Sequence, residues 1–409
     1  MLIGFLYVLF SLIGFGYFLF LKRRLDFLTI GFVSQQIYFS PCLVYYFFSG
    51  HPDIYPVEVG VYITGILLII SFIFFSINLY ENNKNRQRIY INFGFKYHAL
   101  FSTLLASTAF VLSIIQSGDV LFSGAKADVL DSINRFYILW SICALYGILI
   151  SYLCKQKIYF FINLFLLLVT IYIGFRSIAA IAAISLLVFY FVKENKATSL
   201  IFEHYKSALL AVFFGAFFLV YKGLYIAIKF KDYEMVLNRL LDKQFYIDVL
   251  VNAEPFGIQM IFSDVLNQDY YIGLENLNRF ILLFTLFSND LGIDARSFNQ
   301  YFQSDLYGDV GYGMGSNVWA HMYSSGGWML LVIFIIIYAL SLRWFSYKIY
   351  YSNYNYAPLL IVLGSYWSFY IHRNDLFYQL GLEKRVLIVF VIVSILSLFY
   401  SRLKTTFKR

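Results

Sequence analysis

The chain has 409 residues, of which 61% are hydrophobic and only 13% are charged, and its formal net charge is +8. So apolar a composition excludes an ordinary soluble domain, and its repeated apolar runs have the length that a bilayer core requires. The three cysteines are scattered, and neither the histidines nor any glycine-rich loop has the spacing of a zinc or nucleotide-phosphate site. The sequence therefore predicts a membrane protein without a disulfide framework or ATP hydrolysis.

The apolar runs predict an all-α polytopic membrane protein with about 11 transmembrane helices, in a range of about 10 to 12. The first run has neither a basic start nor a small-residue cleavage site, so we interpret it as a retained helix and not as a signal peptide. We find no internal repeat and no linker, which predicts a single integral membrane domain over residues 1–409. The predicted spans are 2–21, 27–49, 57–80, 95–117, 133–154, 157–174, 177–192, 206–229, 327–347, 357–372 and 386–402.

Lysine and arginine gather in alternate loops, and such loops normally face the cytoplasm. This rule places the amino terminus outside and the carboxyl terminus inside. Segment 231–325 has 5 basic and 12 acidic residues, so it lies outside and forms most of one large loop over 230–326. One patch disagrees, because Glu383-Lys384-Arg385 falls outside with a positive balance. The net positive charge is thus an orientation signal, and we expect no nucleic acid as a partner.

Three charged side chains near the external ends of predicted spans are candidates for function. Arg176 lies in the short turn GFRS, and Arg373 and Asp375 lie in the segment HRND. An arginine at bilayer depth is costly unless it faces a wet cavity or a partner. Together these residues predict a cationic pocket for a phosphate or pyrophosphate. The plainer alternatives are that Arg176 snorkels to the headgroups and that Arg373 and Asp375 form a local ion pair.

The most polar, glycine-dense run of the chain comes directly before the ninth predicted span. Ser316 is the expected N-cap of a short helix whose face carries Asn317 and His321, four residues apart. Gly326-Gly327 should separate that helix from the span. His321 taken alone is more often a satisfied or interfacial histidine than a catalyst, and the whole run can also be read as a flexible glycine connector.

Amphipathic helices are expected inside the large external loop. Polar residues interrupt the apolar pattern of 270–287 too often for a span, which indicates a helix lying along the membrane. The segment SFNQYFQSDLYGDVGYG mixes aromatic side chains with amides and acids, as sugar-contacting surfaces do.

The chain resembles the Wzy-type O-antigen polymerases. The resemblance rests on the many spans, on the single large external loop, on the GFRS and RND motifs, and on the run GMGSNVWAHMYSSGGW directly before a span. It implies a GT-C-like helical bundle in the bacterial inner membrane, with the loop 230–326 and the active site facing the periplasm. It also implies a metal-independent glycosyltransferase without a cofactor, and a polysaccharide chain-length regulator as a partner besides membrane lipid.

The resemblance further implies a reaction. A sugar hydroxyl of one undecaprenyl-pyrophosphate-linked oligosaccharide attacks the anomeric carbon of a second, and undecaprenyl pyrophosphate leaves. Arg176 and Arg373 are then expected to bind the pyrophosphate. His321 is expected to take the proton, and Asp375 either orients Arg373 or serves as the base. Asn317 and Tyr323 are expected to bind sugar hydroxyls.

Two other functions fit the same residue types. An O-antigen ligase transfers the same lipid-linked glycan to lipid A–core, and the residue types separate it poorly from a polymerase. A flippase for the lipid-linked unit is disfavoured, because transporters usually carry charges at mid-membrane and have paired halves. A structural or assembly membrane protein without enzymatic activity is disfavoured further.

Overall fold

The protein is described here from a computed structural model. The structure describes residues 2–49, 54–77, 79, 95–118, 120–123, 133–194, 196–280, 296–308, 315–351 and 356–406. Within these ranges the chain is helical and has no strand, apart from one isolated antiparallel bridge between Arg23 and Thr198. The elements in the first half are α1 (Leu2–Phe15), η1 (Gly16–Phe20), α2 (Phe27–Tyr38), α3 (Ser40–Phe48), α4 (Val59–Ser76), α5 (Phe95–Ser117), α6 (Val120–Ser123), α8 (Arg135–Leu153), α9 (Lys157–Ile173) and α10 (Ser177–Glu194).

The second half contains the segment that the sequence places in the large loop. Its elements are α11 (Leu200–Lys229), α12 (Tyr233–Leu241), α13 (Lys243–Val251), α14 (Glu254–Asn267), η2 (Leu274–Arg279), α16 (Phe298–Phe302), η3 (Gln303–Tyr307), α17 (Val318–Tyr351), α18 (Ala357–Ser365), η4 (Tyr366–Tyr370), η5 (Ile371–Arg373) and α19 (Leu376–Thr406).

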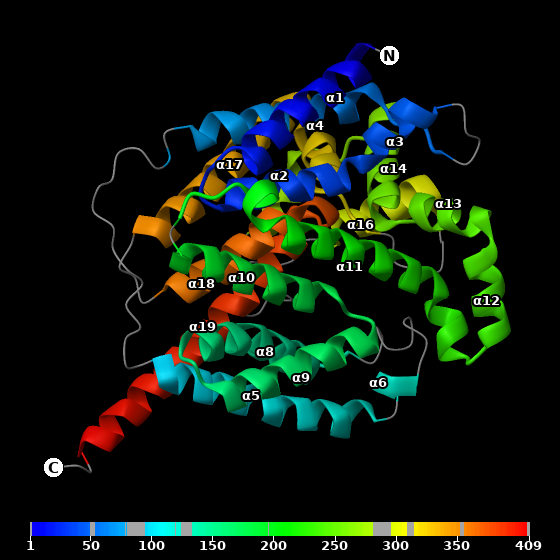
Figure 1. The fold of residues 1–409 in the computed structure, drawn as a ribbon. Helices are drawn as coiled ribbons and strands as arrows, with labels where there is room; N and C mark the ends of the chain where they lie inside the picture. The colour runs from blue at the N-terminus through cyan, green and yellow to red at the C-terminus, as the bar shows by residue number, and fades with distance from the viewer. Residues whose placement is uncertain are drawn as a thin grey trace.

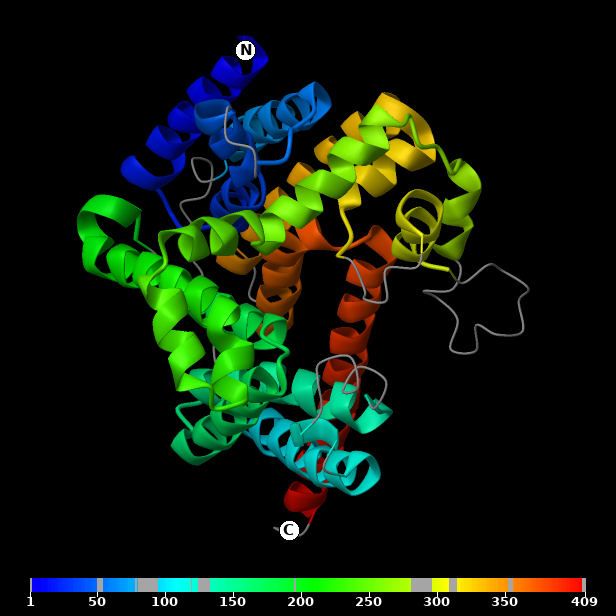
Figure 2. The same ribbon diagram turned by 90° about the vertical axis from the view of Figure 1, so that its right-hand side faces the viewer.

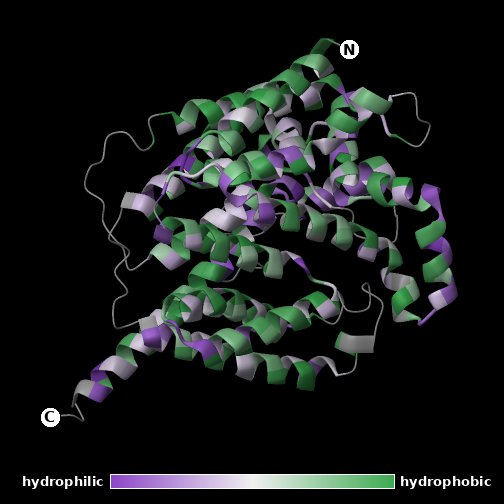
Figure 3. Ribbon diagram, viewed as in Figure 1, coloured by the Kyte–Doolittle hydropathy of each residue, from purple (hydrophilic) through white to green (hydrophobic). Residues whose placement is uncertain are grey.

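Seven of the described helices are long and apolar enough to cross a membrane, and the number reaches nine if each of two bent helix pairs is one span. The exterior fits a lipid environment, because Ile115, Ile158 and Met329 expose 74%, 75% and 77% of their surface. Figure 3 shows hydrophobic residues along all the long helices. The chain is therefore an all-α membrane protein with several spans.

Each predicted span corresponds to a helix in the structure. Not every one of these helices is long and apolar enough to count as a membrane span by itself. α9 has 17 residues and falls just short, and α18 is a 9-residue helix that continues into the π-helical η4. Conversely, α13 and α14 form one of the two bent pairs although the sequence assigns them to the external loop. The expected number of about 11 spans is therefore only partly supported.

The second predicted span is the other bent pair, in which α2 and α3 meet at 40°. Pro41 stands in the first turn of α3, where it removes a backbone donor and favours a bend. The polar residues that interrupt this span in the sequence are buried inside the bundle. The hydroxyl of Ser34 donates to the Phe369 carbonyl over 2.8 Å, and the Gln36 amide donates to Gln35 over 2.7 Å. Internal partners of this kind make polar side chains tolerable within a membrane.

The long helices run side by side in layers, and α19 joins two groups of them. Figure 1 places α1, α4, α17 and α2 in one group and α5, α8 and α9 in another, with α10 and α18 between them. Figure 2 shows α19 leaving the α17–α18 region and crossing to α5 and α8. The turn at the start of α19 therefore lies where both groups meet.

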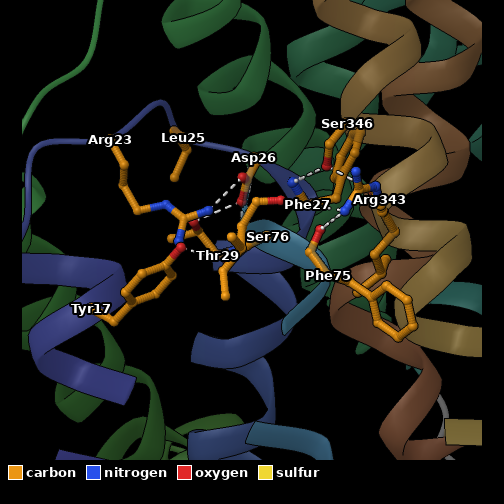
Figure 4. Close-up of polar contacts among 12 residues, drawn as sticks. Tyr17, Arg23, Leu25, Asp26, Phe27, Thr29, Phe75, Ser76, Arg343 and Ser346 are labelled. Atoms are coloured by element: carbon orange, nitrogen blue, oxygen red, sulfur yellow. Dashed lines mark hydrogen bonds and ion pairs between the residues drawn. The ribbon is translucent and has the colours of Figure 1, made fainter. Parts of the chain in front are cut away.

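A polar cluster joins η1, α2, α4 and α17 at one end of the bundle (Figure 4). Asp26 is fully buried, forms an ion pair with Arg23 over 2.8 Å, and accepts hydrogen bonds from both the backbone N–H and the hydroxyl of Thr29 over 2.7 Å. Arg343 of α17 donates to the Phe75 carbonyl at the end of α4 over 2.8 Å. These contacts satisfy buried charges and helix ends and fix the register of four helices.

Candidate functional site

The turn between η5 and α19 is built by local hydrogen bonds. Asp375 is the N-cap of α19, since its Oδ1 accepts the backbone N–H of Tyr378 over 2.7 Å. The side-chain amide of Asn374 donates to the Tyr370 carbonyl over 3.1 Å and to Gln379 Oε1 over 3.0 Å. The RND motif is thus held rigidly between two helices.

The side chain of Arg373 extends from this turn toward α14. Its Nε lies 2.7 Å from Oε1 of Glu254, and its guanidinium carbon lies 5.1 Å from the ring centre of Tyr370. Its backbone carbonyl accepts the N–H of Ser316 over 3.2 Å. The predicted role of Asp375 in orienting Arg373 is therefore filled by Glu254 in the part of the chain that the structure describes. The side chain of Arg373 remains 30% exposed, so its outer face is open to a ligand.

Arg176 lies in the turn between α9 and α10. Gly174 closes α9 with a left-handed φ of 111°, and the Phe175 N–H bonds to the Thr170 carbonyl, which gives a Schellman-type end. The guanidinium lies 5.7 Å from the ring centre of Tyr221 on α11. The next residue, Ser177, begins α10, which packs against η4, and it lies within interaction range of Tyr370.

Tyr370 therefore joins the two arginine-bearing segments that the sequence analysis selected. Ser177, next to Arg176, lies within interaction range of its hydroxyl, and Tyr370 lies under the guanidinium of Arg373. The turn after α9 and the turn before α19 are almost 200 positions apart in sequence, as their numbers show. The shared cationic region stays a prediction, and the sequence analysis did not select Tyr370.

The sequence analysis also missed two members of this region, Tyr378 and Arg385. Tyr378 lies within electrostatic range of Arg373 and Tyr370, and Arg385 lies within range of Tyr366. The predicted last span begins ten residues too late, because α19 already starts at Leu376 and includes Arg385. The charge patch at 383–385 that disagreed with the loop pattern is therefore part of a helix. The positive charge balance of residues 383–385 was the signal in the sequence that could have identified Arg385.

A half-open cleft of about 200 Å³ lies on the other side of the turn. It is lined by Arg279, Ser297, Asp375, Phe377, Tyr378, Gly381 and Arg385. Burial raises the pKa of the Asp375 carboxyl, and the Tyr378 N–H and the charge of Arg279 oppose that shift. A carboxyl group with a raised pKa beside arginines can accept a proton from a hydroxyl group that enters the cleft.

His321 is fully buried behind this cleft. Its Nε2 lies 2.8 Å from the side-chain amide of Asn276, and its Nδ1 accepts the backbone N–H of Leu376 over 3.3 Å. Its ring stacks on Phe298, with centres 5.1 Å apart. Its predicted role as the general base stays a prediction, and this geometry engages both ring nitrogens within the protein.

Asn317, and not Ser316 as expected, caps the helix that carries His321. Asn317 Oδ1 accepts the N–H of Trp319 over 2.9 Å, and its amide donates to the Ile258 carbonyl over 3.0 Å. Because Asn317 is fully buried, these contacts favour a structural role over its predicted sugar binding. The break at Gly326-Gly327 is confirmed, with Gly327 at φ 62° and ψ −160°.

Tyr323 points to the surface and donates to Asp269 over 3.0 Å. It packs edge-on against Trp328, with ring centres 5.5 Å apart. Its predicted sugar contact is therefore sterically accessible, and it stays a prediction. In the segment predicted as an amphipathic helix, the described part is the 3-10 helix η2, while residues 281–287 lie outside the described ranges.

Replacing Asn317 with alanine should destabilise the protein. The substitution removes the cap of α17 and the hydrogen bond from Asn317 to the Ile258 carbonyl of α14, at a cost of about 1–2 kcal/mol. The expected readout is a lower apparent melting temperature in detergent. Ser316→Ala is the matched control, and a larger effect of Ser316→Ala than of Asn317→Ala would contradict this assignment of the cap.

Compared with protein-family models, with curated proteins and with solved structures, the chain matches none of them.

Proposed function

We propose that this chain is an O-antigen polymerase of the bacterial inner membrane. It joins undecaprenyl-pyrophosphate-linked oligosaccharide repeat units on the periplasmic face and releases undecaprenyl pyrophosphate. The observation that carries the proposal is Arg373, held by Glu254 and Tyr370 in a protein with several membrane spans, with the residue after Arg176 beside the same tyrosine. Two arginines presented near a lipid phase suit a lipid-linked pyrophosphate leaving group.

Different residues act on different atoms in the proposed reaction. The oxygen of an acceptor hydroxyl forms a bond to the anomeric carbon of the donor, and the bond from that carbon to the pyrophosphate oxygen breaks. The electron pair leaves with the pyrophosphate, whose negative charge Arg373 and Arg176 stabilise. The proton goes to the carboxylate of Asp375, which lines the cleft and is held rigidly at the start of α19. Glu254 orients Arg373.

The experiment that tests the function is a lipopolysaccharide gel of the strain that carries this gene, after deletion of the gene. Core with a single repeat unit and no ladder supports the polymerase. Bare core instead indicates the ligase or the flippase, and lipid-linked polymer accumulating on the periplasmic side then selects the ligase. An unchanged ladder would refute the proposal.

Arg176→Ala should lower polymerisation by about 10-fold or more, because one of two charges facing the leaving group is lost. Ladder density in the deletion strain, normalised to protein level, measures the effect. Lys157→Ala is the matched control, since it removes an exposed positive charge from the opposite end of the same helix, α9. Equal ladders from Arg176→Ala and Lys157→Ala would remove Arg176 from the site.

A further inference from the structure

We infer that His321 is a positioning residue that holds the walls of the Asp375 cleft in register and does not itself take the proton. The inference rests on the proposed function, because it assigns a role within the same reaction. It starts from the contacts of the His321 ring, which reach three separate elements.

The ring is enclosed on both faces and bonded at both edges. Phe298 of α16 stacks on one face at an interplanar angle of 15°, and the Phe377 ring of α19 lies 5.4 Å away, centre to centre. At the edges, Asn276 of η2 and the N–H of Leu376 contact the two ring nitrogens. A side chain with these contacts behaves as a fixed part of the core.

The hydrogen bonds define the protonation state of the ring. Nδ1 accepts the Leu376 N–H, so it carries no proton, and in the neutral imidazole the proton is then on Nε2. Nε2–H needs an acceptor, which the amide of Asn276 provides when its oxygen faces the ring; nitrogen and oxygen of an amide have the same shape. Burial of the ring disfavours an added proton, and so does the nearby charge of Arg279. The neutral ring therefore fits its surroundings as one donor and one acceptor.

Every element that the ring contacts also supplies a wall of the cleft. Asn276 lies three residues before Arg279 on the 3-10 helix η2, and residues at that spacing share one face of such a helix. Phe298 directly follows Ser297, and Leu376 directly follows Asp375. Arg279, Ser297 and Asp375 all line the cleft. The imidazole thus fixes the position of an arginine, a hydroxyl and a carboxylate relative to one another.

A general base needs a different arrangement. It must present a free lone pair within hydrogen-bond reach of the proton that it abstracts. The Nδ1 lone pair of His321 is used by Leu376, its Nε2 is occupied by Asn276, and its surface is 0% exposed. Asp375 is the group that borders the cleft. The structure therefore gives the two residues separate tasks.

The discriminating experiment compares His321→Gln with His321→Leu in the deletion strain. Glutamine offers one amide donor and one amide acceptor and cannot act as a base at neutral pH, whereas leucine offers neither. A positioning role predicts that His321→Gln keeps ladder synthesis within about 5-fold of the wild type and that His321→Leu loses about 10-fold or more. Loss of a base would lower the activity of His321→Gln by about 100-fold or more.

The pH dependence of the wild type and of His321→Gln provides a second test. A histidine base would give a decline in ladder synthesis toward acid near its ordinary pKa of about 6.5, and His321→Gln would lack that decline. A permanently neutral His321 predicts that the wild type and His321→Gln share one pH profile between about pH 8 and about pH 6 in resting cells, because any decline then belongs to Asp375, whose pKa burial raises. A decline centred near about pH 6.5 that is present in the wild type and absent from His321→Gln would overturn the inference.

Arg373→Ala is measured in parallel to separate the two proposals. Inactive Arg373→Ala with active His321→Gln supports both. If Arg373→Ala is inactive and His321→Gln is folded but also inactive, only the positioning role is refuted. Fully active Arg373→Ala refutes the proposed pyrophosphate site, and the positioning role with it.

Discussion

Arg373→Ala should reduce polymer synthesis by about 100-fold, which is the typical effect of removing one preorganised group that stabilises developing charge. Arg373 is held by Glu254 over 2.7 Å and lies over Tyr370, so its charge is in place before substrate binds. Arg373→Lys should recover only part of the activity. A lysine carries the charge but lacks the planar fork that contacts the carboxylate and the ring together. Ladder density per amount of folded protein is the measurement.

Two variants test whether the effect is local. Lys243→Ala removes an exposed positive charge on α13 and should leave the ladder unchanged. Glu254→Gln keeps an oxygen for Arg373 but removes the negative charge, so a moderate loss is expected. If Arg373→Ala and Lys243→Ala have equal ladders, Arg373 does not act on the leaving group.

Asp26→Ala should destabilise the protein by about 3–5 kcal/mol, because it leaves the partner of a buried ion pair without its counter-charge. Asp26 is fully buried and accepts three hydrogen bonds, two from Thr29 and one from Arg23 (Figure 4). The guanidinium of Arg23 is also enclosed by the rings of Tyr17 and Phe18, at 4.8 and 4.5 Å. The apparent melting temperature in detergent should fall, and less protein should accumulate in the membrane.

The double variant Arg23→Ala/Asp26→Ala is the internal control. Residues in direct contact have non-additive effects, so the double variant should be more stable than the sum of the single losses predicts. Asp26→Asn should lie between the wild type and Asp26→Ala, since an amide can still cap α2. Strict additivity of the two single substitutions would show that Arg23 and Asp26 are not coupled.

Part of the candidate site could be predicted from the sequence because its polar residues stand out against apolar spans. Arg176 and Arg373 were selected in this way, and the structure connects their turns through Tyr370. Glu254, Tyr370, Tyr378 and Arg385 were not selected. They lie within helices or among many similar residues, and only their neighbours in space distinguish them.

The same limit explains the errors at individual positions. Ser316 and Asn317 are equally good N-caps in a sequence, and the packing of Asn317 against the Ile258 carbonyl decides between them. Asp375 was paired with Arg373 because they are neighbours in the chain. In the folded protein Arg373 extends toward Glu254 on α14, and Asp375 caps α19 and borders the cleft.

The sequence by itself determined the class of this protein and the break at Gly326-Gly327. Apolar length is a property of each segment alone, and only glycine readily adopts the backbone conformation found at Gly327. Only the tertiary structure decided which polar groups meet: Arg373 with Glu254 and Tyr370, and His321 with Asn276 and Leu376. Contacts between distant segments depend on how the helices pack, and the local pattern of each helix does not specify its neighbour.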